Sequence, residues 1–212
     1  MKNLPQYIEN QFFSLLNHKV SIKEFEQWVY ATDELEAVLS ERDYLDLIAF
    51  NFSQLNAFDK LECLIIDLIE LGKYEKYRLI YQLNLIVEKD SLWENAVEIL
   101  HGDYCDGYNF LEPFFSIHFM NADDHEYYPK LNENRHQLTE EMYVLARKEA
   151  LQLLNYFNTD TIVIKNSREG HRSGQHYTDN RTKEEKARPF FDIKQTKNWW
   201  EFWKKTPPQY LH

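Results

Sequence analysis

The segment from residue 57 to residue 72 constrains the fold more than any other part of the sequence. Leucine and isoleucine occupy most positions around the helix that this segment predicts, at Leu61, Leu64, Ile65, Ile66, Leu68, Ile69 and Leu71. A helix that is apolar nearly all the way round needs neighbours on most of its sides. We therefore expect it to be a central element of a helix bundle, with Gly72 as its C-terminal cap.

Helical periodicity recurs on both sides of this segment, with apolar residues at intervals of three and four. The further predicted helices begin near Leu4, at the capping box Ser21–Glu24, after Asp33 and after Ser40, and then cover about 73–88, 91–102 and 138–157. The helix over 73–88 should run antiparallel to its predecessor because the link between them is so short. The sequence thus predicts a mainly α fold, built as a multi-helix bundle.

The character of the chain changes after Asn158. Residues 161–164 are β-branched and predict a strand, while 166–189 are polar and indicate a loop or a weak hairpin. Three tryptophans within 198–205 predict a short aromatic helix or strap. We therefore expect an acidic helical body over 1–158 and, over 159–212, a strand, loop and aromatic appendage packed on that body.

Composition narrows the class of protein. Glycine is sparse, with 5 residues in 212, and aromatic residues make up 16% of the chain. The first value disfavours turn-rich all-β folds and phosphate-binding loops, and the second exceeds what a disordered chain carries. Cys63 and Cys105 form no paired motif, which fits a reducing compartment. The sequence shows neither a secretion signal nor an apolar run long enough to span a bilayer, so we expect a cytoplasmic protein without a membrane partner.

The net charge of −11 is unevenly distributed along the chain. Residues 1–150 contain 13 Lys and Arg against 28 Asp and Glu, a net of −15, whereas residues 151–212 contain 11 against 7, a net of +4. An acidic body repels nucleic acid and anionic lipid and attracts basic partners. The charge therefore argues against a nucleic-acid partner and favours a basic protein, although solubility alone explains such a charge equally well.

Acidic residues concentrate in two stretches, 33–46 and 103–126, and tyrosines alternate with carboxylates in the second. Tyrosine adds contact area and a carboxylate pairs with arginine or lysine, so this mixture is typical of protein interfaces. Two solvated faces above core tyrosines would produce the same pattern. The candidate partner-binding residues are Asp33, Glu34, Glu36, Asp43, Asp46, Asp103, Tyr104, Asp106, Tyr108, Asp123, Asp124 and Glu126.

The sequence carries no Walker loop, dinucleotide fingerprint, zinc-protease motif or nucleophile elbow. His101 and Cys105 have helical i, i+4 spacing beside carboxylates, but one histidine and one cysteine fall short of a zinc signature. The segment 170–177 holds two histidines, an arginine and a tyrosine, a set that a nuclease could use, yet no partnering acid stands at motif spacing. We interpret that segment as a polar loop and expect no catalytic residues, no metal and no cofactor.

Four short runs carry a resemblance to a known group of proteins. They are Ser21–Tyr30, Glu34–Glu36, Tyr44–Ile48 and Tyr104–Leu111. These runs resemble parts of small helical bacterial proteins, some of which are encoded beside polymorphic or contact-dependent toxins and act as immunity proteins. The resemblance covers roughly the first half of the chain and rests on helix-forming and aromatic residues.

The resemblance implies a non-enzymatic protein that binds a cognate toxin domain tightly and blocks its active site or substrate path. The charge argument agrees, because a toxin that attacks nucleic acid needs a basic surface and an acidic inhibitor associates with it quickly. The alternative is a structural or scaffold protein that homodimerises through its C-terminal aromatic segment. An enzyme that uses the segment 170–177 is the third interpretation.

Overall fold

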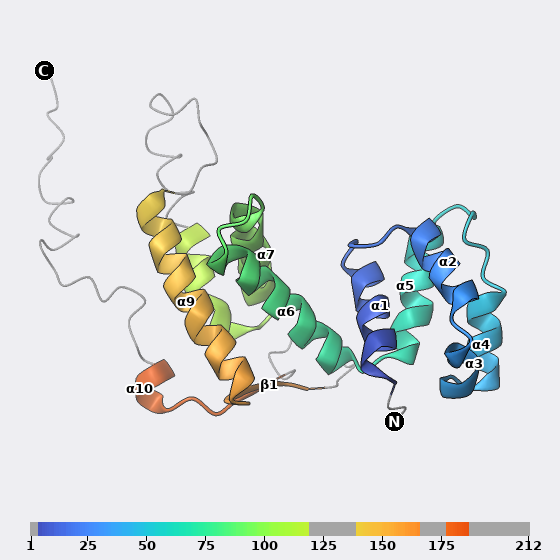
Figure 1. The fold of residues 1–212 in the computed structure, drawn as a ribbon. Helices are drawn as coiled ribbons and strands as arrows, with labels where there is room; N and C mark the ends of the chain where they lie inside the picture. Colours follow the sequence, from blue (N-terminus) through green and yellow to red (C-terminus); the bar gives the residue numbers. More distant parts are fainter. Residues whose placement is uncertain (1–3, 119–138, 166–176, 187–212) are drawn as a thin grey trace, which may run out of the picture. The chain divides into compact units, whose positions relative to one another are not determined.

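The computed structural model describes residues 4–118, 139–165 and 177–186. In these ranges the chain is mainly helical with one small antiparallel sheet, which confirms the predicted fold class (Figure 1). The elements are α1 (Gln6–Leu16), α2 (Ile22–Ala31), α3 (Glu34–Val38), α4 (Glu41–Ile48), α5 (Ala57–Leu68), α6 (Leu71–Val87), α7 (Trp93–Cys105), the 3₁₀ helix η1 (Asn109–Leu111), α9 (Glu140–Asn158), β1 (Ile162–Ile164), β2 (Tyr177–Asp179) and α10 (Lys183–Lys186). Residues 112–118, directly after η1, are also helical.

The chain divides into two compact units, Met1–Arg181 and Thr182–His212. The first unit extends past the boundary that we expect after residue 158, because β1 contacts both α6 and α9. In the second unit the described element is α10, where Thr182 and Glu185 form a reciprocal cap through their backbone N–H groups and side chains. The aromatic strap expected over 198–205 lies outside the described residues.

Helices α1 to α5 share a hydrophobic core. Phe12 and Phe25 are fully buried with ring centroids 6.0 Å apart, and Trp28 meets Phe12 edge-on at 5.7 Å. Such tilted and edge-on pairs are favourable because the positive edge of one ring meets the negative face of another. The buried members of this core are Leu4, Ile8, Phe12, Phe13, Leu15, Leu16, Phe25, Val29, Leu35, Leu39, Leu47, Phe52, Leu61, Ile65, Leu68 and Ile69.

Two helix starts follow the caps that the sequence predicts. The Ser21 hydroxyl accepts a hydrogen bond from the Glu24 N–H, and the Glu24 carboxylate accepts one from the Ser21 N–H at 2.8 Å. At the start of α4 the Ser40 hydroxyl accepts from the Asp43 N–H and donates to the Asp43 carboxylate at 2.6 Å. Both predicted caps are confirmed.

Two glycines that we expect at helix ends lie inside helices instead. The backbone of Ile69 is extended and ends α5 at Leu68, so Gly72 falls in the first turn of α6, where it is buried. Gly102 lies within α7, which continues to Cys105. The chain turns at Gly107, whose φ of 111° suits glycine because other residues rarely adopt it.

Among the described elements, α6 has neighbours on several sides, since it contacts α1, α7, α9 and β1. Its residues Leu79, Leu83 and Ile86 are fully buried. This is the position that the sequence predicts for 57–72, but α5 buries mainly one stripe, with Leu64 and Ile66 only half-buried. Polar residues interrupt the apolar pattern of α6, so periodicity does not predict that this helix is central.

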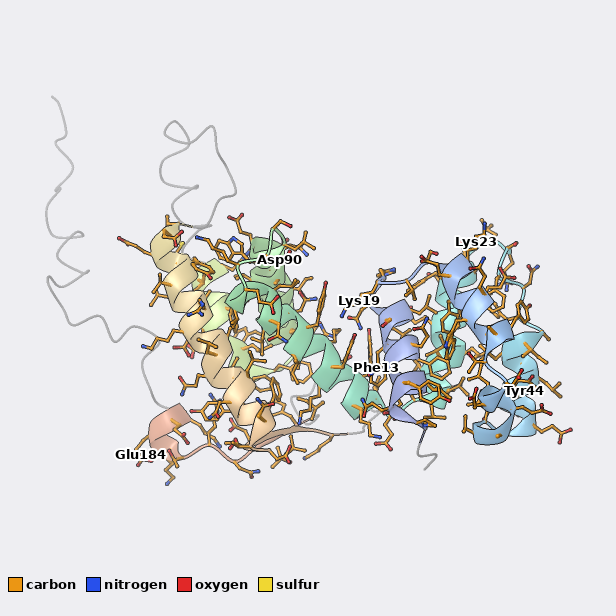
Figure 2. All side chains as sticks on the ribbon, in the orientation of Figure 1. Phe13, Lys19, Lys23, Tyr44, Asp90 and Glu184 are labelled. Atoms are coloured by element: carbon orange, nitrogen blue, oxygen red, sulfur yellow. The ribbon has the colours of Figure 1, made fainter. Side chains whose placement is uncertain are left out.

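Side chains tie α6 to its neighbours at both ends. Lys19, from the turn after α1, donates to the Tyr77 hydroxyl at 2.9 Å and lies 3.5 Å above the Tyr81 ring (Figure 2). The Lys76 ammonium donates to the Phe157 carbonyl at the end of α9, at 2.9 Å. In return, the Arg147 Nε donates to the Val87 carbonyl at the end of α6, at 3.1 Å.

These bonds fix α6 and α9 as an antiparallel pair, because a residue in the first half of each helix meets the end of the other. Each cation satisfies a carbonyl that has no partner within its own helix, at the end where the helix dipole is negative. The pair is therefore held by its helix ends as well as by apolar packing.

The small sheet pairs β1 with β2 in antiparallel register, with Ile162 opposite Asp179 and Ile164 opposite Tyr177. Ile162 and Ile164 are buried while Val163 points outward. The strand predicted over 161–164 is thereby confirmed. Tyr177 packs edge-on against Phe110 at 4.9 Å, which joins the sheet to η1.

The Ser21 cap generates a stability prediction. We expect Ser21→Ala to lower the free energy of unfolding by about 1 kcal/mol, because an N-terminal N–H of α2 loses its acceptor. Urea unfolding followed by circular dichroism measures the change. Ser53→Ala removes an exposed hydroxyl outside any helix and should change stability by less than about 0.5 kcal/mol. Equal effects of the two substitutions would contradict the role assigned to the cap.

Candidate functional site

The structure brings acidic side chains from α4 and α5 together around a small surface pocket. The pocket has a volume of about 260 Å³, and we call it the acidic pocket. Its lining residues are Arg42, Asp43, Asp46, Leu64, Asp67 and Leu68. The lining contains three carboxylates and one guanidinium, and the two leucines form an apolar wall. Such a lining suits a cationic group on an apolar stem.

Local structure explains how α4 presents these groups. Ser40 caps α4 and holds the Asp43 carboxylate at the first turn of the helix. One turn later, the Asp46 carboxylate lies 3.7 Å from the Arg42 Nε, and both side chains are largely exposed. An exposed ion pair of this length contributes little to stability, so Asp46 can exchange Arg42 for another cation at small cost.

The acidic residues of the preceding segment are exposed but do not line the pocket. Asp33, Glu34 and Glu36 all lie at the surface in and just before α3. Helix α3 contacts α4, and its Leu35 is buried in the hydrophobic core that also contains Leu47 of α4. These three carboxylates therefore add negative charge to the α3–α4 region, without belonging to the acidic pocket.

Two candidate residues of the second acidic stretch lie in the interior, which corrects their placement on a partner-binding surface. Asp103 accepts two hydrogen bonds from Arg78, at 2.9 and 2.7 Å, and both side chains are mostly buried. Arg78 also donates to Glu75, at 3.2 and 2.8 Å. Tyr108 is only 9% exposed, and its hydroxyl lies 3.4 Å from Glu75 Oε2. A buried carboxylate needs such a partner, and Arg78 is that partner for Asp103.

Burial and charge shift the ionisation of these interior groups. Burial by itself lowers the pKa of the Arg78 guanidinium, but the neighbouring charges of Glu75 and Asp103 outweigh burial and raise that pKa. Burial raises the pKa of the Asp103 carboxyl, while the hydrogen bonds and charge of Arg78 oppose that shift. Burial also raises the pKa of the Tyr108 phenol, and the nearby Glu75 carboxylate adds to the shift. Tyr108 therefore stays neutral and able to donate.

The other candidates of this stretch differ in position. Tyr104 is half-buried and its ring lies 4.8 Å from that of Phe115, whereas Asp106 is exposed just after the end of α7. The remaining candidates, Asp123, Asp124 and Glu126, lie outside the described residues. Of the described candidates in this stretch, Asp106 is thus at the surface, whereas Asp103 and Tyr108 are in the interior.

A pair of histidines joins α7 to the helical residues 112–118. The rings of His101 and His118 stack with centroids 4.2 Å apart, and Phe115 stacks on His101 at 5.4 Å. The Cys105 Sγ lies 3.7 Å from the His101 Nε2, as their i, i+4 spacing predicts. Among the described residues, no three His, Cys, Asp or Glu side chains are arranged so that they could hold a metal ion.

Burial lowers the pKa of His101, and the proximity of His118 lowers it further, while Glu98 opposes the shift. His101 is therefore protonated less readily in the folded chain than in the unfolded chain.

Of the segment 170–177, the structure describes Tyr177 alone. Its ring packs between elements, 4.9 Å from Phe110 and 5.9 Å from Tyr108. Burial raises the pKa of the Tyr177 phenol. A tyrosine held in this way contributes to packing, and the histidines and the arginine of the segment lie outside the described residues.

Sequence reasoning missed two sets of residues. The first set completes the acidic pocket and consists of Leu64, Asp67 and Leu68. These residues come from the segment 57–72, for which the sequence predicts only a central helix of the bundle. Arg78 is the partner of Asp103, although 25 residues separate them. A signal for the second set was present, because Glu75 and Arg78 stand at i, i+3 on a helix whose other positions are largely apolar or aromatic.

Comparisons of the chain with models of protein families, with curated proteins and with solved structures gave no match in any of the three. Within the described ranges, no helix combines the length and the apolar character needed to cross a bilayer.

The interior ion pair generates a stability prediction. We expect Arg78→Ala to lower the free energy of unfolding by about 3–5 kcal/mol, because it leaves the Asp103 carboxylate buried without a cation. The double variant Arg78→Met/Asp103→Leu should recover most of this loss, since it removes both charges. Chemical unfolding at neutral pH measures both effects. If Arg78→Ala changes stability no more than an average surface substitution, the pairing does not matter to the fold.

The histidine pair generates a prediction about pH. Folding lowers the pKa of His101, so at mildly acidic pH the unfolded chain binds more protons than the folded chain. Protonation of His101 therefore lowers the stability of the fold as the pH falls below about 6.5, the pKa of histidine in the unfolded chain. We expect His118→Phe to reduce the loss of stability between neutral and mildly acidic pH, because it keeps the stacking and removes the second charge. Thermal unfolding across this pH range measures it.

His18→Asn is the matched control for the pH prediction. His18 stacks on Phe58 rather than on another histidine, and asparagine tolerates its left-handed backbone. The pH dependence of this control is compared with that of His118→Phe. A pH dependence that is the same in His118→Phe and in the unmodified chain would exclude the histidine pair as its source.

Proposed function

We propose that the chain is an immunity protein, which binds a basic bacterial toxin domain through the acidic pocket and the α3–α4 region and thereby neutralises it. The observation that carries this proposal is the acidic pocket itself. It joins three carboxylates and two leucines from the successive helices α4 and α5. The resemblance of residues 21–30, 34–36, 44–48 and 104–111 to immunity proteins supports the same conclusion from the sequence.

The pocket fits the chemistry of a lysine or arginine side chain. The aliphatic stem of either residue can lie along Leu64 and Leu68, while its charged head meets Asp46 and Asp67. Asp33, Glu34 and Glu36 add exposed negative charge near by in the chain. A basic toxin is attracted to such a surface before contact, which raises the rate of association.

Neutralisation follows if the bound surface of the toxin is the one that meets nucleic acid. Carboxylates then occupy the places of phosphates, and the substrate cannot enter. This part of the proposal requires no catalytic group in the chain, in agreement with the expectation from sequence that the protein is not an enzyme.

Co-expression with the neighbouring gene product tests the proposal. We expect a complex that survives purification and restores growth to cells that produce the toxin. No complex and no rescue would refute it. The alternative of a homodimer depends on the C-terminal aromatic segment, which lies outside the described residues, so it stays a prediction.

Charge reversal tests the surface itself. We expect Asp46→Lys/Asp67→Lys to lower the association rate constant for the toxin by at least about tenfold at low salt, with a smaller effect at high salt. Stopped-flow or surface-plasmon measurements provide the rates. Glu88→Lys makes the same kind of charge change at the end of α6 and should have a small effect. A double variant that binds as fast as the unmodified chain would place the interface elsewhere.

A further inference from the structure

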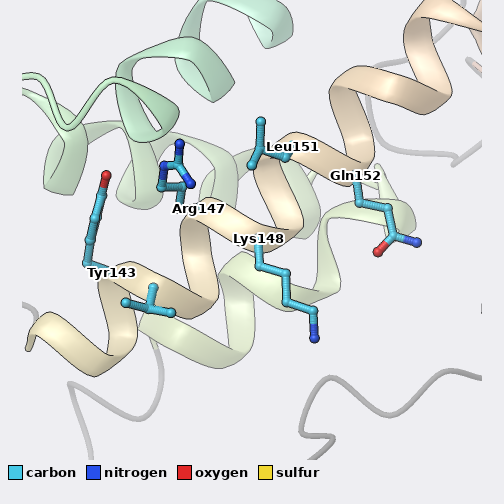
Figure 3. Close-up of a pocket in the computed structure, with 6 residues that line it drawn as sticks. Tyr143, Arg147, Lys148, Leu151 and Gln152 are labelled. Atoms are coloured by element: carbon cyan, nitrogen blue, oxygen red, sulfur yellow. The ribbon is translucent and has the colours of Figure 1, made fainter.

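The outer side of α9 combines exposed apolar and cationic residues around an open pocket of about 700 Å³ (Figure 3). Val144 is 59% exposed and Leu151 is 43% exposed, values that are high for large apolar side chains. The described residues that line the pocket are Tyr143, Val144, Arg147, Lys148, Leu151 and Gln152. All of them belong to α9.

Helical spacing arranges four of these residues as a compact group. Val144 and Leu151 stand at i, i+7, two turns apart, which corresponds to about 10 Å along the helix. Arg147 and Lys148 are each three or four residues from both of them, so both cations lie between the two apolar side chains. We call Val144, Arg147, Lys148 and Leu151 the α9 stripe.

The opposite side of α9 is already used for packing. Ala146, Ala150 and Leu153 are buried, and α9 contacts α6 and β1 through that side. Val144, Lys148 and Leu151 are therefore not needed to hold α9 in the fold, whereas Arg147 also ties α9 to α6 through the Val87 carbonyl.

Arg147 and Lys148 both have hydrogen-bond donors that an anionic ligand can accept from. One N–H of Arg147 is held by the Val87 carbonyl at 3.1 Å, which restrains the guanidinium and lowers the entropy lost on binding. Among the described residues, neither the other N–H groups of Arg147 nor the Lys148 ammonium has a hydrogen-bond partner. These donors can therefore bind a carboxylate.

We propose that the α9 stripe is a second interaction surface, which binds a protein segment that carries carboxylates between two apolar side chains. Charge complementarity identifies this partner: the chain has a net charge of −11, yet the described residues that line this pocket include two cations and no carboxylate. Glu140 and Glu141 lie one turn before Val144, and Glu140 is paired with Lys89. The apolar side chains of the segment cover Val144 and Leu151, and its carboxylates pair with Arg147 and Lys148. The basic toxin of the proposed function has the wrong charge for this surface, so the two proposals are independent.

A pair of synthetic peptides tests the inference on the full chain. The first is a short amphipathic helix with leucines at helical spacing and glutamates between them, and the second has lysines in place of the glutamates. Fluorescence anisotropy at low and high salt measures binding. We expect the acidic peptide to bind, more weakly as salt rises, and the basic peptide not to bind at this surface.

Two variants with matched controls locate the binding. Lys148→Glu and Leu151→Ser should each lower the affinity for the acidic peptide by about tenfold, which corresponds to the loss of one favourable contact of about 1.4 kcal/mol. Lys23→Glu and Leu55→Ser make the same changes at exposed positions outside α9 and should leave binding unchanged. Circular dichroism verifies that all four variants are folded.

Four results would overturn the inference. They are an acidic peptide that does not bind, binding of the basic peptide that Leu151→Ser weakens as much as it weakens binding of the acidic peptide, equal weakening in variants and controls, and a homodimer that Leu151→Ser dissociates. Binding to vesicles of anionic lipid that depends on Lys148, without binding to the acidic peptide, would likewise assign the stripe to a membrane instead. None of these results bears on the toxin complex, which is measured separately.

Discussion

Arg78 makes four hydrogen bonds in the interior, two to Asp103 of α7 and two to Glu75 of its own helix. The guanidinium supplies a planar set of donors that makes all four bonds, one more than the three donors of a lysine allow. Tyr108 completes the group by lying within reach of Glu75. The junction of α6, α7 and η1 thus depends on charges that are costly to bury singly and acceptable only together.

Helix α6 carries this junction and also forms the antiparallel pair with α9. Lys76 and Arg147 each donate to the last turn of the other helix, so the pair is fixed in direction and offset. Because α9 is fixed by one side, its other side is free to present Val144, Lys148 and Leu151. The proposed acidic pocket and the α9 stripe therefore come from separate helices, each with one side committed to the fold.

Much of the secondary structure follows from local signals in the sequence. The capping serines Ser21 and Ser40, the strand over 161–164 and the long helix near 138–157 are all where the sequence places them, because each depends on residues within a few positions. The candidate site was predicted only in part. Asp43 and Asp46 do line a pocket, but Asp103 and Tyr108 are interior. Periodicity cannot distinguish a carboxylate that faces water from one that faces an arginine of another helix.

The sequence by itself determined that this chain is mainly helical, where several helices begin, and that its first 150 residues are strongly acidic. Only the tertiary structure decided that α6 rather than 57–72 has neighbours on several sides, that Asp67 joins Asp43 and Asp46, and that Arg78 neutralises Asp103. The reason is physical. Helix caps and periodicity act over three or four residues. The pairings of Asp67 and of Arg78 join positions 21 to 25 residues apart, and the bonds between α6 and α9 span 60 and 81 residues, so these contacts are set by how helices pack.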